Sequence, residues 1–363
     1  MEKISSEIEL QIGITDYCNF NCIMCMQSAH EGLYGNTDIK TSVLHENKKG
    51  FMDFNLFKKI IDDISQLDFK MKTVAFHWLG ESMMHPKFSE FIEYACQKNS
   101  EQKFTEYFIL FTNCYFLTEK ITDFLLKAIG KNPFIIVFSL DSISENTFKK
   151  IHRNKHFFRV YDNVKKFTEK SSEIDSIYRI YRFLVMEENF FEAGDFFQYW
   201  AKFLKNDFQI TFNEEKNFNF SFSKNIINFK RVASFDVKKA EKLFTETIDS
   251  IFNHKKEKIN VFDSFNFFEN ISLRPPCSAP FRTPVINWDG TLTVCCPDDK
   301  MELALGNVSD FNFEQLWFGK KAGEIRNSHI DGKLENYDRC RRCPNYAGRP
   351  LEQKEMEFYS KIC

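Results

Sequence analysis

Ile8-Glu-Leu-Gln-Ile-Gly-Ile14 and Cys18-Asn-Phe-Asn-Cys22-Ile-Met-Cys25 stand three residues apart near the start of the chain. The first stretch alternates apolar residues with others, which is the period-two pattern of a half-buried strand. The second places three thiols in a C-x3-C-x2-C spacing directly after that strand. Cubane iron-sulfur clusters normally take four thiolates, so three neighbouring ones can hold a cluster and leave one iron open. A zinc site, which usually wants four ligands, and reduced core thiols are the alternatives.

Outward from this stretch, β-rich runs alternate with stretches of helical periodicity. The rhythm predicts an α/β fold in which crossover helices join the strands of a parallel sheet. Six strands are expected, at 9–14, 73–79, 104–112, 134–140, 177–186 and 208–212. Helices are expected at 54–67, 87–99, 118–128, 157–170, 191–203 and 237–252. The long segments 30–50 and 213–235 are expected to be loops, of the kind that form lids or binding loops.

Length and composition narrow the class of protein. A chain of 363 residues exceeds what one core usually supports, so we expect two domains. The net charge of -2 gives no drive toward nucleic acid. The eleven cysteines fall in close groups, which favours metal binding in a reducing compartment, the cytoplasm, over a disulfide framework. Neither a signal peptide nor a window of 18 apolar residues is visible, so no membrane association is expected.

The cysteine triplet resembles that of the radical S-adenosylmethionine (radical SAM) enzymes, although Met24 stands where that family usually has an aromatic residue. The resemblance implies a partial (β/α)6 TIM-like barrel and a [4Fe-4S] cluster on Cys18, Cys22 and Cys25. It also implies that SAM chelates the open iron and is cleaved there to a 5'-deoxyadenosyl radical by one electron. A reducing partner such as flavodoxin or ferredoxin would supply that electron.

Further motifs follow the predicted strands, where ligands gather in parallel α/β folds. Leu79-Gly80-Glu81-Ser82 resembles the family's Gly-Gly-Glu motif, which receives the SAM amino group. A small residue allows close approach of backbone to a ligand, and a carboxylate accepts a hydrogen bond from an ammonium group. An ordinary turn is the alternative for this dipeptide. Its position directly after a strand favours the site.

Three later segments complete the implied SAM site. Thr112-Asn113-Cys114 resembles the family's Thr-Asn-Gly, so either the Cys114 thiol enters the pocket or it is an inert buried side chain. Ser139 and Asp141 open a segment that resembles one contacting the ribose and carboxylate of SAM. In that segment Ile151-His152-Arg153-Asn154 stands where the family has Ile-Arg-Arg-Gly, and Arg153 is the candidate because a guanidinium suits a carboxylate.

Asn189 is a further residue that the resemblance marks, in the sequence Met186-Glu-Glu-Asn189. Asparagine is also a preferred residue at a helix N-cap, and a helix is expected directly after it. We therefore expect Asn189 mainly to cap the helix that begins near residue 191.

A second cysteine group lies near the other end of the chain. Its spacing is C-x17-C-x44-C-x2-C and its members are Cys277, Cys295, Cys340 and Cys343. The group resembles a SPASM domain, and in particular its shortened form, the twitch domain known from 2-deoxy-scyllo-inosamine dehydrogenase. That resemblance implies one auxiliary [4Fe-4S] cluster with four thiolates; a zinc ribbon is the alternative. Cys295 is preferred over Cys296 on spacing, since adjacent strand residues face opposite ways.

The domain boundaries and the hairpin of the second domain follow from these groups. Residues 1–255 are expected to form the radical SAM barrel, 256–270 a linker, and 271–363 the SPASM/twitch-like domain and tail. Trp288-Asp-Gly290-Thr-Leu-Thr-Val-Cys295 predicts a hairpin, because Asp-Gly between β-rich runs favours a tight turn. A helix is expected to start near residues 314–317.

For the reaction, two hypotheses remain open. Dehydrogenation of a small polar substrate, a sugar or an aminocyclitol, needs an electron acceptor, which a closed auxiliary cluster could provide. Epimerisation needs a hydrogen donor, for which Cys114, Cys296 and Cys363 are the candidates. Peptide modification is the alternative substrate class, though only 17 residues precede the triplet, few for a leader-peptide recognition domain. A non-catalytic zinc or iron-sulfur scaffold is the alternative outside enzymes.

Overall fold

The computed structural model describes residues 7–27, 49–212, 223–234, 236–252, 275–341, 343, 351, 355–357 and 359. Within these residues one curved sheet of ten strands organises the protein, in the order β10-β9-β8-β1-β2-β3-β4-β5-β7-β6. The seven strands that build the barrel are parallel to their neighbours. They are β1 (Glu9–Ile12), β2 (Met71–Ala75), β3 (Thr105–Thr112), β4 (Phe134–Ser139), β5 (Ile177–Val185), β6 (Gln209–Phe212) and β7 (Asn225–Arg231).

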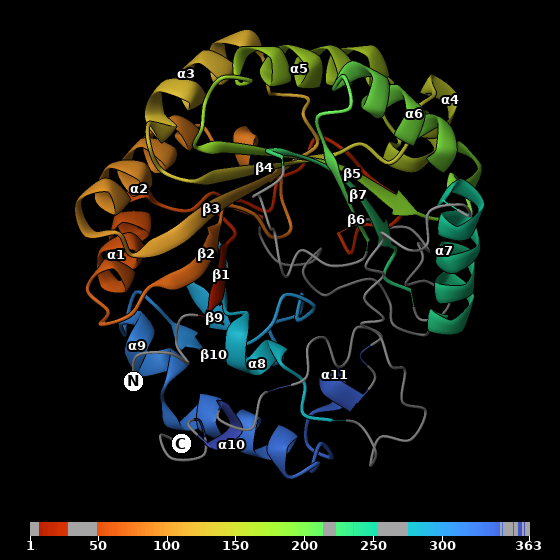
Figure 1. Ribbon diagram of the computed structural model, residues 1–363. Helices are drawn as coiled ribbons and strands as arrows, with labels where there is room; N and C mark the ends of the chain where they lie inside the picture. Colours follow the sequence, from red (N-terminus) through yellow and green to blue (C-terminus); the bar gives the residue numbers. More distant parts are fainter. Residues whose placement is uncertain are drawn as a thin grey trace.

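Helices cover the convex face of this sheet and leave its concave face toward the centre of the molecule (Figure 1). They are α1 (Phe54–Ser65), α2 (Phe88–Gln102), α3 (Glu119–Ile129), α4 (Glu145–His152), α5 (Phe157–Lys170), α6 (Ala193–Phe203) and α7 (Val237–Phe252), with short 3-10 turns η3 (Ser82–Met84) and η4 (Phe190–Glu192). The sheet-to-helix layer forms a large apolar core rich in phenylalanine. A smaller cluster lines the concave face, with Ala75, Ile109, Ile135, Val137, Ile180 and Ile226. The predicted α/β partial barrel is confirmed.

One strand was not expected. Strand β7 lies inside the segment 213–235, which the sequence suggested was a loop, and it inserts between β5 and β6. Its sequence Asn-Ile-Ile-Asn-Phe-Lys-Arg mixes polar residues into the apolar run, because Asn228 sits on the polar part of the concave face beside Thr211. The period-two pattern is therefore hard to recognise from sequence alone. The expected loop at 30–50 falls largely outside the described residues.

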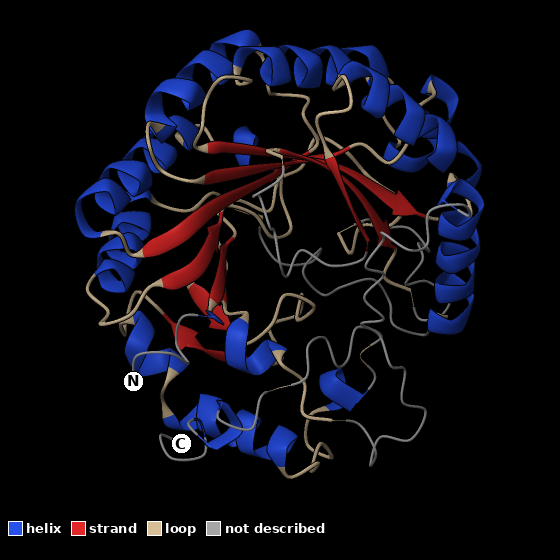
Figure 2. Ribbon diagram, viewed as in Figure 1, coloured by secondary structure: helices blue, strands red, loops and turns tan. Residues whose placement is uncertain are grey.

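The second domain continues the same sheet (Figure 2). Strand β8 (Val285–Ile286) pairs in parallel with β1, and β9 (Thr291–Thr293) and β10 (Ala304–Asn307) extend the sheet antiparallel. The predicted hairpin is confirmed: β8 and β9 pair, and Gly290 takes a positive φ of 88° that favours glycine. This C-terminal portion also contains four helices: α8 (Ala279–Arg282), α9 (Phe313–Trp317), α10 (Lys320–Ile330) and α11 (Asp338–Arg341).

The expected linker 256–270 lies outside the described residues, so the domain boundaries stay a prediction. In the part of the chain that the structure describes, no helix is long and apolar enough to span a bilayer.

Candidate functional site

The first cysteine group lies in the loop that follows β1. This loop rests on the carboxyl end of α4: the Ile23 N–H donates to the carbonyl of Ile151 (2.9 Å), and the Asn21 N–H donates to that of His152 (3.4 Å). The last turn of a helix carries carbonyls without helical partners, so it offers acceptors to such a loop. All three thiols are partly buried. The loop is thus held by a helix more than 100 residues further along the chain.

The thiols of this loop act on one another electrostatically. Burial raises the pKa of Cys18 to about 12, and the charges of Glu81 and Cys25 add to the effect. Burial also raises the pKa of Cys22 well above its usual value, with further contributions from Cys25 and Cys18. Three close thiolates without a compensating cation are unfavourable in such a place. The iron of a cluster supplies that positive charge, so the donor set fits a cluster.

Gly80 brings the loop after β2 against the cluster loop. A Cβ at this position would lie 2.2 Å from the carbonyl oxygen of Thr15 and 2.8 Å from that of Tyr17. The next residue fixes the approach, because the Glu81 N–H donates to the Tyr17 carbonyl at 2.9 Å. Only glycine allows two backbones this close. Gly80 therefore serves the packing of two loops at the site.

The Glu81 carboxylate is buried and accepts several hydrogen bonds. Its donors are the backbone N–H of Asn113 (2.8 Å), the Thr112 hydroxyl (3.1 Å) and the N–H of Met83 (3.3 Å). Burial nevertheless raises the pKa of this carboxyl to about 7. Glu81 thus joins the ends of β2 and β3, and the lone pairs that these donors leave free are what a ligand ammonium group could use.

Asn113 connects β3 to the cluster loop. Its side-chain amide donates to Asn19 Oδ1 at 2.9 Å and lies 3.8 Å from the sulfur of Cys18. Cys114, directly after it, has a positive φ of 64°, a conformation that suits the glycine of the Thr-Asn-Gly motif that this segment resembles. Its thiol is fully buried and donates to the Thr112 carbonyl at 3.5 Å. Asn113 therefore reaches the cluster loop, whereas the Cys114 thiol points into the core.

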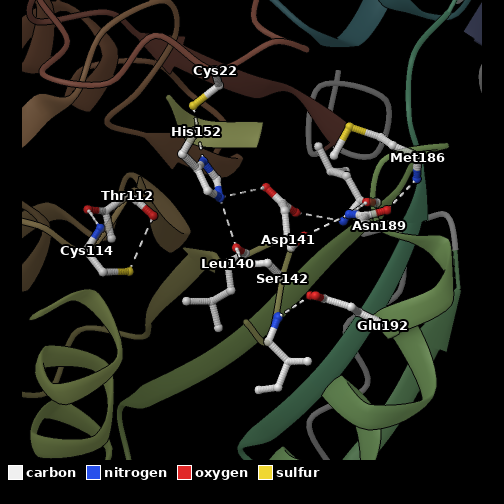
Figure 3. Close-up of polar contacts among 12 residues, drawn as sticks. Cys22, Thr112, Cys114, Leu140, Asp141, Ser142, His152, Met186, Asn189 and Glu192 are labelled. Carbon is white, nitrogen blue, oxygen red and sulfur yellow. Dashed lines mark hydrogen bonds and ion pairs between the residues drawn. The ribbon is translucent and has the colours of Figure 1, made fainter. Parts of the chain in front are cut away.

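His152 contacts the cluster loop, and sequence reasoning did not select it. Its Nδ1 lies 3.2 Å from the sulfur of Cys22, and its Nε2 lies 2.9 Å from the carbonyl oxygen of Leu140 (Figure 3). Burial lowers the pKa of His152 to about 4. Arg153, the predicted residue, is exposed at the C-cap of α4 with a φ of 49°. The sequence signal for His152 was its departure from the Ile-Arg-Arg-Gly motif that this segment resembles.

Asp141 and Asn189 fasten the ends of β4 and β5 beneath His152. Asp141 takes a φ of 56° and is buried; its Oδ1 accepts the Leu184 N–H at 2.7 Å, and its Oδ2 lies 3.9 Å from His152 Nε2. Burial raises its pKa to about 7. Asn189 donates to the carbonyls of Asp141 (2.8 Å) and Leu184 (2.7 Å). Its side chain makes no cap hydrogen bond, so the expectation of a helix cap is wrong: it joins two strand ends instead.

Ser139 ends β4 on the concave face. It is partly buried and stands in register with Arg182 of the neighbouring β5. Arg182 in turn donates through Nε to Asn228 Oδ1 (3.1 Å) and lies 5.1 Å from the ring of Phe111. Polar groups therefore line the concave face just beyond the strand ends that hold Gly80, Asn113 and Asp141.

The second cysteine group comes together from three segments. Cys277 and Cys340 belong to the main apolar core, and Cys295 and Cys343 pack against it. Burial raises the pKa of Cys295 well above its usual value, and the charges of Cys343 and Cys340 raise it further. Burial also raises the pKa of Cys340, with added effects of Cys277 and Cys343. All four predicted thiols are thus near enough to interact, which fits a four-thiolate cluster.

Two aspartates shape the Cys295 loop. Asp298 accepts the N–H groups of Glu302 and Leu303, both at 2.9 Å. Asp299 pairs with Arg339 at 2.7 Å, which ties the loop to α11 and its Cys340. In the described part of the chain, no three His, Cys, Asp or Glu side chains converge on one point as the ligands of a single ion do.

Of the other predicted thiols in the described residues, Cys114 lies in the barrel core, and Cys296 is near enough to Cys295 for its charge to raise the pKa of that thiol further. Cys296 is partly buried and packs in a separate apolar cluster with Trp78, Leu79 and Val285. Cys363 lies outside the described residues.

Two segments of the chain match models of known protein families. Residues 12–190 match the model of the radical SAM superfamily, and residues 277–344 match SPASM, an iron-sulfur cluster-binding domain. These segments contain the first and the second cysteine group respectively.

Individual proteins resemble the chain more distantly. A curated relative, the tungsten-containing aldehyde ferredoxin oxidoreductase cofactor-modifying protein of Pyrococcus furiosus, is 30% identical over 83 residues, which are 23% of this chain and 19% of the relative. The structure of BtrN in complex with AdoMet and 2-DOIA covers 98% of this chain and 99% of its own, with a TM-score of 0.52 and 16% identity.

Two further structures have the same fold. Native anSMEcpe with bound AdoMet covers 98% of this chain and 95% of its own, with a TM-score of 0.59 and 16% identity. SuiB of Streptococcus suis, bound to precursor peptide SuiA, covers 99% and 71%, with a TM-score of 0.54 and 14% identity. At these identities the likeness concerns the fold alone.

Proposed function

Because this chain belongs to the radical SAM superfamily and carries a C-terminal SPASM domain, we propose that it dehydrogenates a small polar substrate, a sugar or an aminocyclitol. It is a radical SAM enzyme that uses a [4Fe-4S] cluster, SAM and an auxiliary iron-sulfur site. The observation that carries the reaction type is the second cysteine group: four buried or partly buried thiols gathered from three segments.

The residues take the following roles in this proposal. Cys18, Cys22 and Cys25 hold the SAM-binding cluster, and Gly80 and Glu81 lie beside it to receive the SAM amino group. A [4Fe-4S] cluster held by these three thiols would supply the one-electron reduction of SAM on which hydrogen abstraction from the substrate depends. Asn113, Ser139 and Asp141 keep the strand ends in place around the ligand, and Arg153 remains a predicted contact to its carboxylate.

Cys277, Cys295, Cys340 and Cys343 are proposed as ligands of one auxiliary [4Fe-4S] cluster. Four thiolates occupy every iron corner and leave none for a substrate to ligate. Such a closed site suits electron acceptance, which dehydrogenation requires because a substrate radical next to a hydroxyl must lose one more electron and a proton to become a ketone. This supports dehydrogenation above the alternatives.

Epimerisation is the second candidate within this substrate class. Its hydrogen donor would have to reach the substrate. Cys114 is fully buried in the core, whereas Cys296 is partly exposed at the edge of the second group. Among the described thiols outside the two groups, Cys296 is therefore the better donor candidate. Modification of a peptide is the alternative substrate class.

The test compares Cys340→Ala with Cys96→Ala, which removes a buried thiol of α2 away from both cysteine groups. Both variants are reconstituted anaerobically and assayed with cyclitols, sugars and a peptide for 5'-deoxyadenosine and for oxidised product. We expect Cys340→Ala to keep SAM cleavage and lose the ketone, and Cys96→Ala to keep both. Full turnover by Cys340→Ala contradicts an electron-accepting second cluster. A product of inverted configuration, formed without net oxidation, favours epimerisation instead.

A further inference from the structure

Two tryptophans cross between the barrel and the SPASM segment in opposite directions. Trp78, in the loop after β2, donates its indole N–H to the carbonyl oxygen of Cys296 at 2.9 Å. Trp288, in the β8–β9 turn, donates its indole N–H to Oδ2 of Asp16 at 3.1 Å. Each indole belongs to one part of the chain and donates to the other part, and donor and acceptor are 218 residues apart for Trp78 and 272 for Trp288. The two contacts are reciprocal.

A glycine makes room for each indole. A Cβ at Gly13, directly after β1, would lie 3.1 Å from the Trp78 Cβ, and one at Gly50 would lie 2.3 Å from the Trp288 ring. Neither glycine has a left-handed backbone, so conformational freedom does not account for them. The missing side chains are what lets the indoles lie across the backbone. Two glycine–tryptophan pairs therefore lie at the junction between the barrel and the SPASM segment.

Each contact ends beside a proposed cluster ligand. Asp16 is two residues before Cys18, and its other oxygen accepts the Gly50 N–H at 2.8 Å, which closes the base of the cluster loop. Cys296 follows Cys295, and Trp78 itself stands two residues before Gly80. The apolar cluster around Trp78 includes Met26, adjacent to Cys25, and Met301 of the second loop. The junction thus touches both cysteine loops and the loop of the SAM site.

We propose that Trp78 and Trp288 are positioning residues that hold the auxiliary-cluster loop at a fixed place relative to the SAM-cluster loop. The inference rests on the proposed function in taking both cysteine groups as cluster sites. An indole N–H that donates to an acceptor fixes its ring in direction as well as in contact. Loss of either N–H loosens the spacing between the two sites and leaves their ligands intact.

The test replaces each indole by a ring without a donor, in Trp78→Phe, Trp288→Phe and the double variant. Trp200→Phe is the matched control, because Trp200 of α6 packs among Tyr161, Tyr181 and Phe196, away from both cysteine groups. Each reconstituted holoenzyme is measured for iron per chain, for the dipolar interaction between the two reduced clusters by pulsed electron paramagnetic resonance, and for 5'-deoxyadenosine formed per product.

We expect every variant to keep the wild-type iron content and SAM cleavage. The single variants should broaden the distribution of cluster separations and form about five times less product per SAM cleaved, the effect of one lost hydrogen bond on a docking equilibrium. Gly13→Ala, which displaces Trp78 without removing its donor, should shift the same two readouts.

Variants that match Trp200→Phe in both readouts overturn the proposal. So does equal loss of SAM cleavage and product, because a purely structural defect lowers both together. A wild-type protein that binds one cluster only overturns the proposed function first, and iron analysis of that protein identifies this case before any variant is compared.

Discussion

Replacing Glu81 by glutamine tests the electrostatics of the SAM site. Burial raises the pKa of Glu81 from 4.5 to about 7 in the folded protein, against the effect of its three donors. The difference between these two pKa values means that the proton on Glu81 stabilises the folded state by about 3 kcal/mol. The folded state holds this proton more tightly than the unfolded chain does. The stabilisation is therefore complete below pH 4.5 and is lost as the pH rises to about 7.

Glutamine resembles the protonated carboxyl and does not titrate, so Glu81→Gln should lack this loss. We expect its free energy of unfolding, relative to wild type, to rise by about 2 to 3 kcal/mol between pH 5 and pH 8. Urea unfolding of the metal-free proteins at both pH values measures it. Asp141, whose pKa is also raised, is present in both proteins and cancels.

The control for this experiment is Glu93→Gln, at an exposed position of α2. Its difference from wild type should be the same at both pH values. If Glu81→Gln also differs from wild type by a constant amount, Glu81 titrates as an ordinary surface carboxylate and the reasoning from burial is wrong.

Three further substitutions test the neighbouring residues. Gly80→Ala places a Cβ against the Thr15 carbonyl, so it should lower the melting temperature and reduce the iron content by about four irons per chain. The control is Gly194→Ala, whose added Cβ meets nothing closer than 3.9 Å and should change neither quantity. Cys114→Ala should lose about 1 kcal/mol of stability in urea unfolding, because this thiol is buried in the core. The stereochemistry of the product, measured by chiral chromatography, should stay unchanged. An altered stereochemistry would make Cys114 the hydrogen donor. In His152→Leu the buried Leu140 carbonyl loses its donor, and the metal-free Cys22 thiol loses its acceptor, because the neutral ring donates from Nε2 and can only accept at Nδ1. The metal-free variant should lose about 2 kcal/mol of stability in urea unfolding, and an unchanged stability would contradict these contacts.

Much of the barrel could be predicted from sequence, because its local patterns agree with its final structure. Strands β1 to β6 lie within or close to their expected ranges, since each is a short β-rich run, and β2 to β5 are each followed along the chain by a helix-period stretch. Strand β7 was missed because Asn228 and Lys230, which face the polar side of the sheet, interrupt its apolar run. Its insertion between β5 and β6 is a long-range pairing that no local pattern contains.

The same limit applies to the site. Gly80 and Asn113 could be found because Asn113 directly follows β3 and Gly80 lies in the loop after β2, and strand ends meet at one edge of a parallel sheet. His152 reaches Cys22 across 130 residues, and its orientation depends on where α4 ends against the cluster loop. Trp78 was missed for a similar reason: its partner is a carbonyl oxygen, which leaves no trace in side-chain identity.

The most direct test of a two-cluster radical SAM enzyme is a joint measurement on one sample. The chain is reconstituted anaerobically with iron and sulfide, its iron is counted, and 5'-deoxyadenosine is assayed after reduction in the presence of SAM. Two cubanes predict about eight irons per chain, with 5'-deoxyadenosine formed only by the reduced protein. Persistent zinc at the cysteine groups, together with no 5'-deoxyadenosine, would contradict the account.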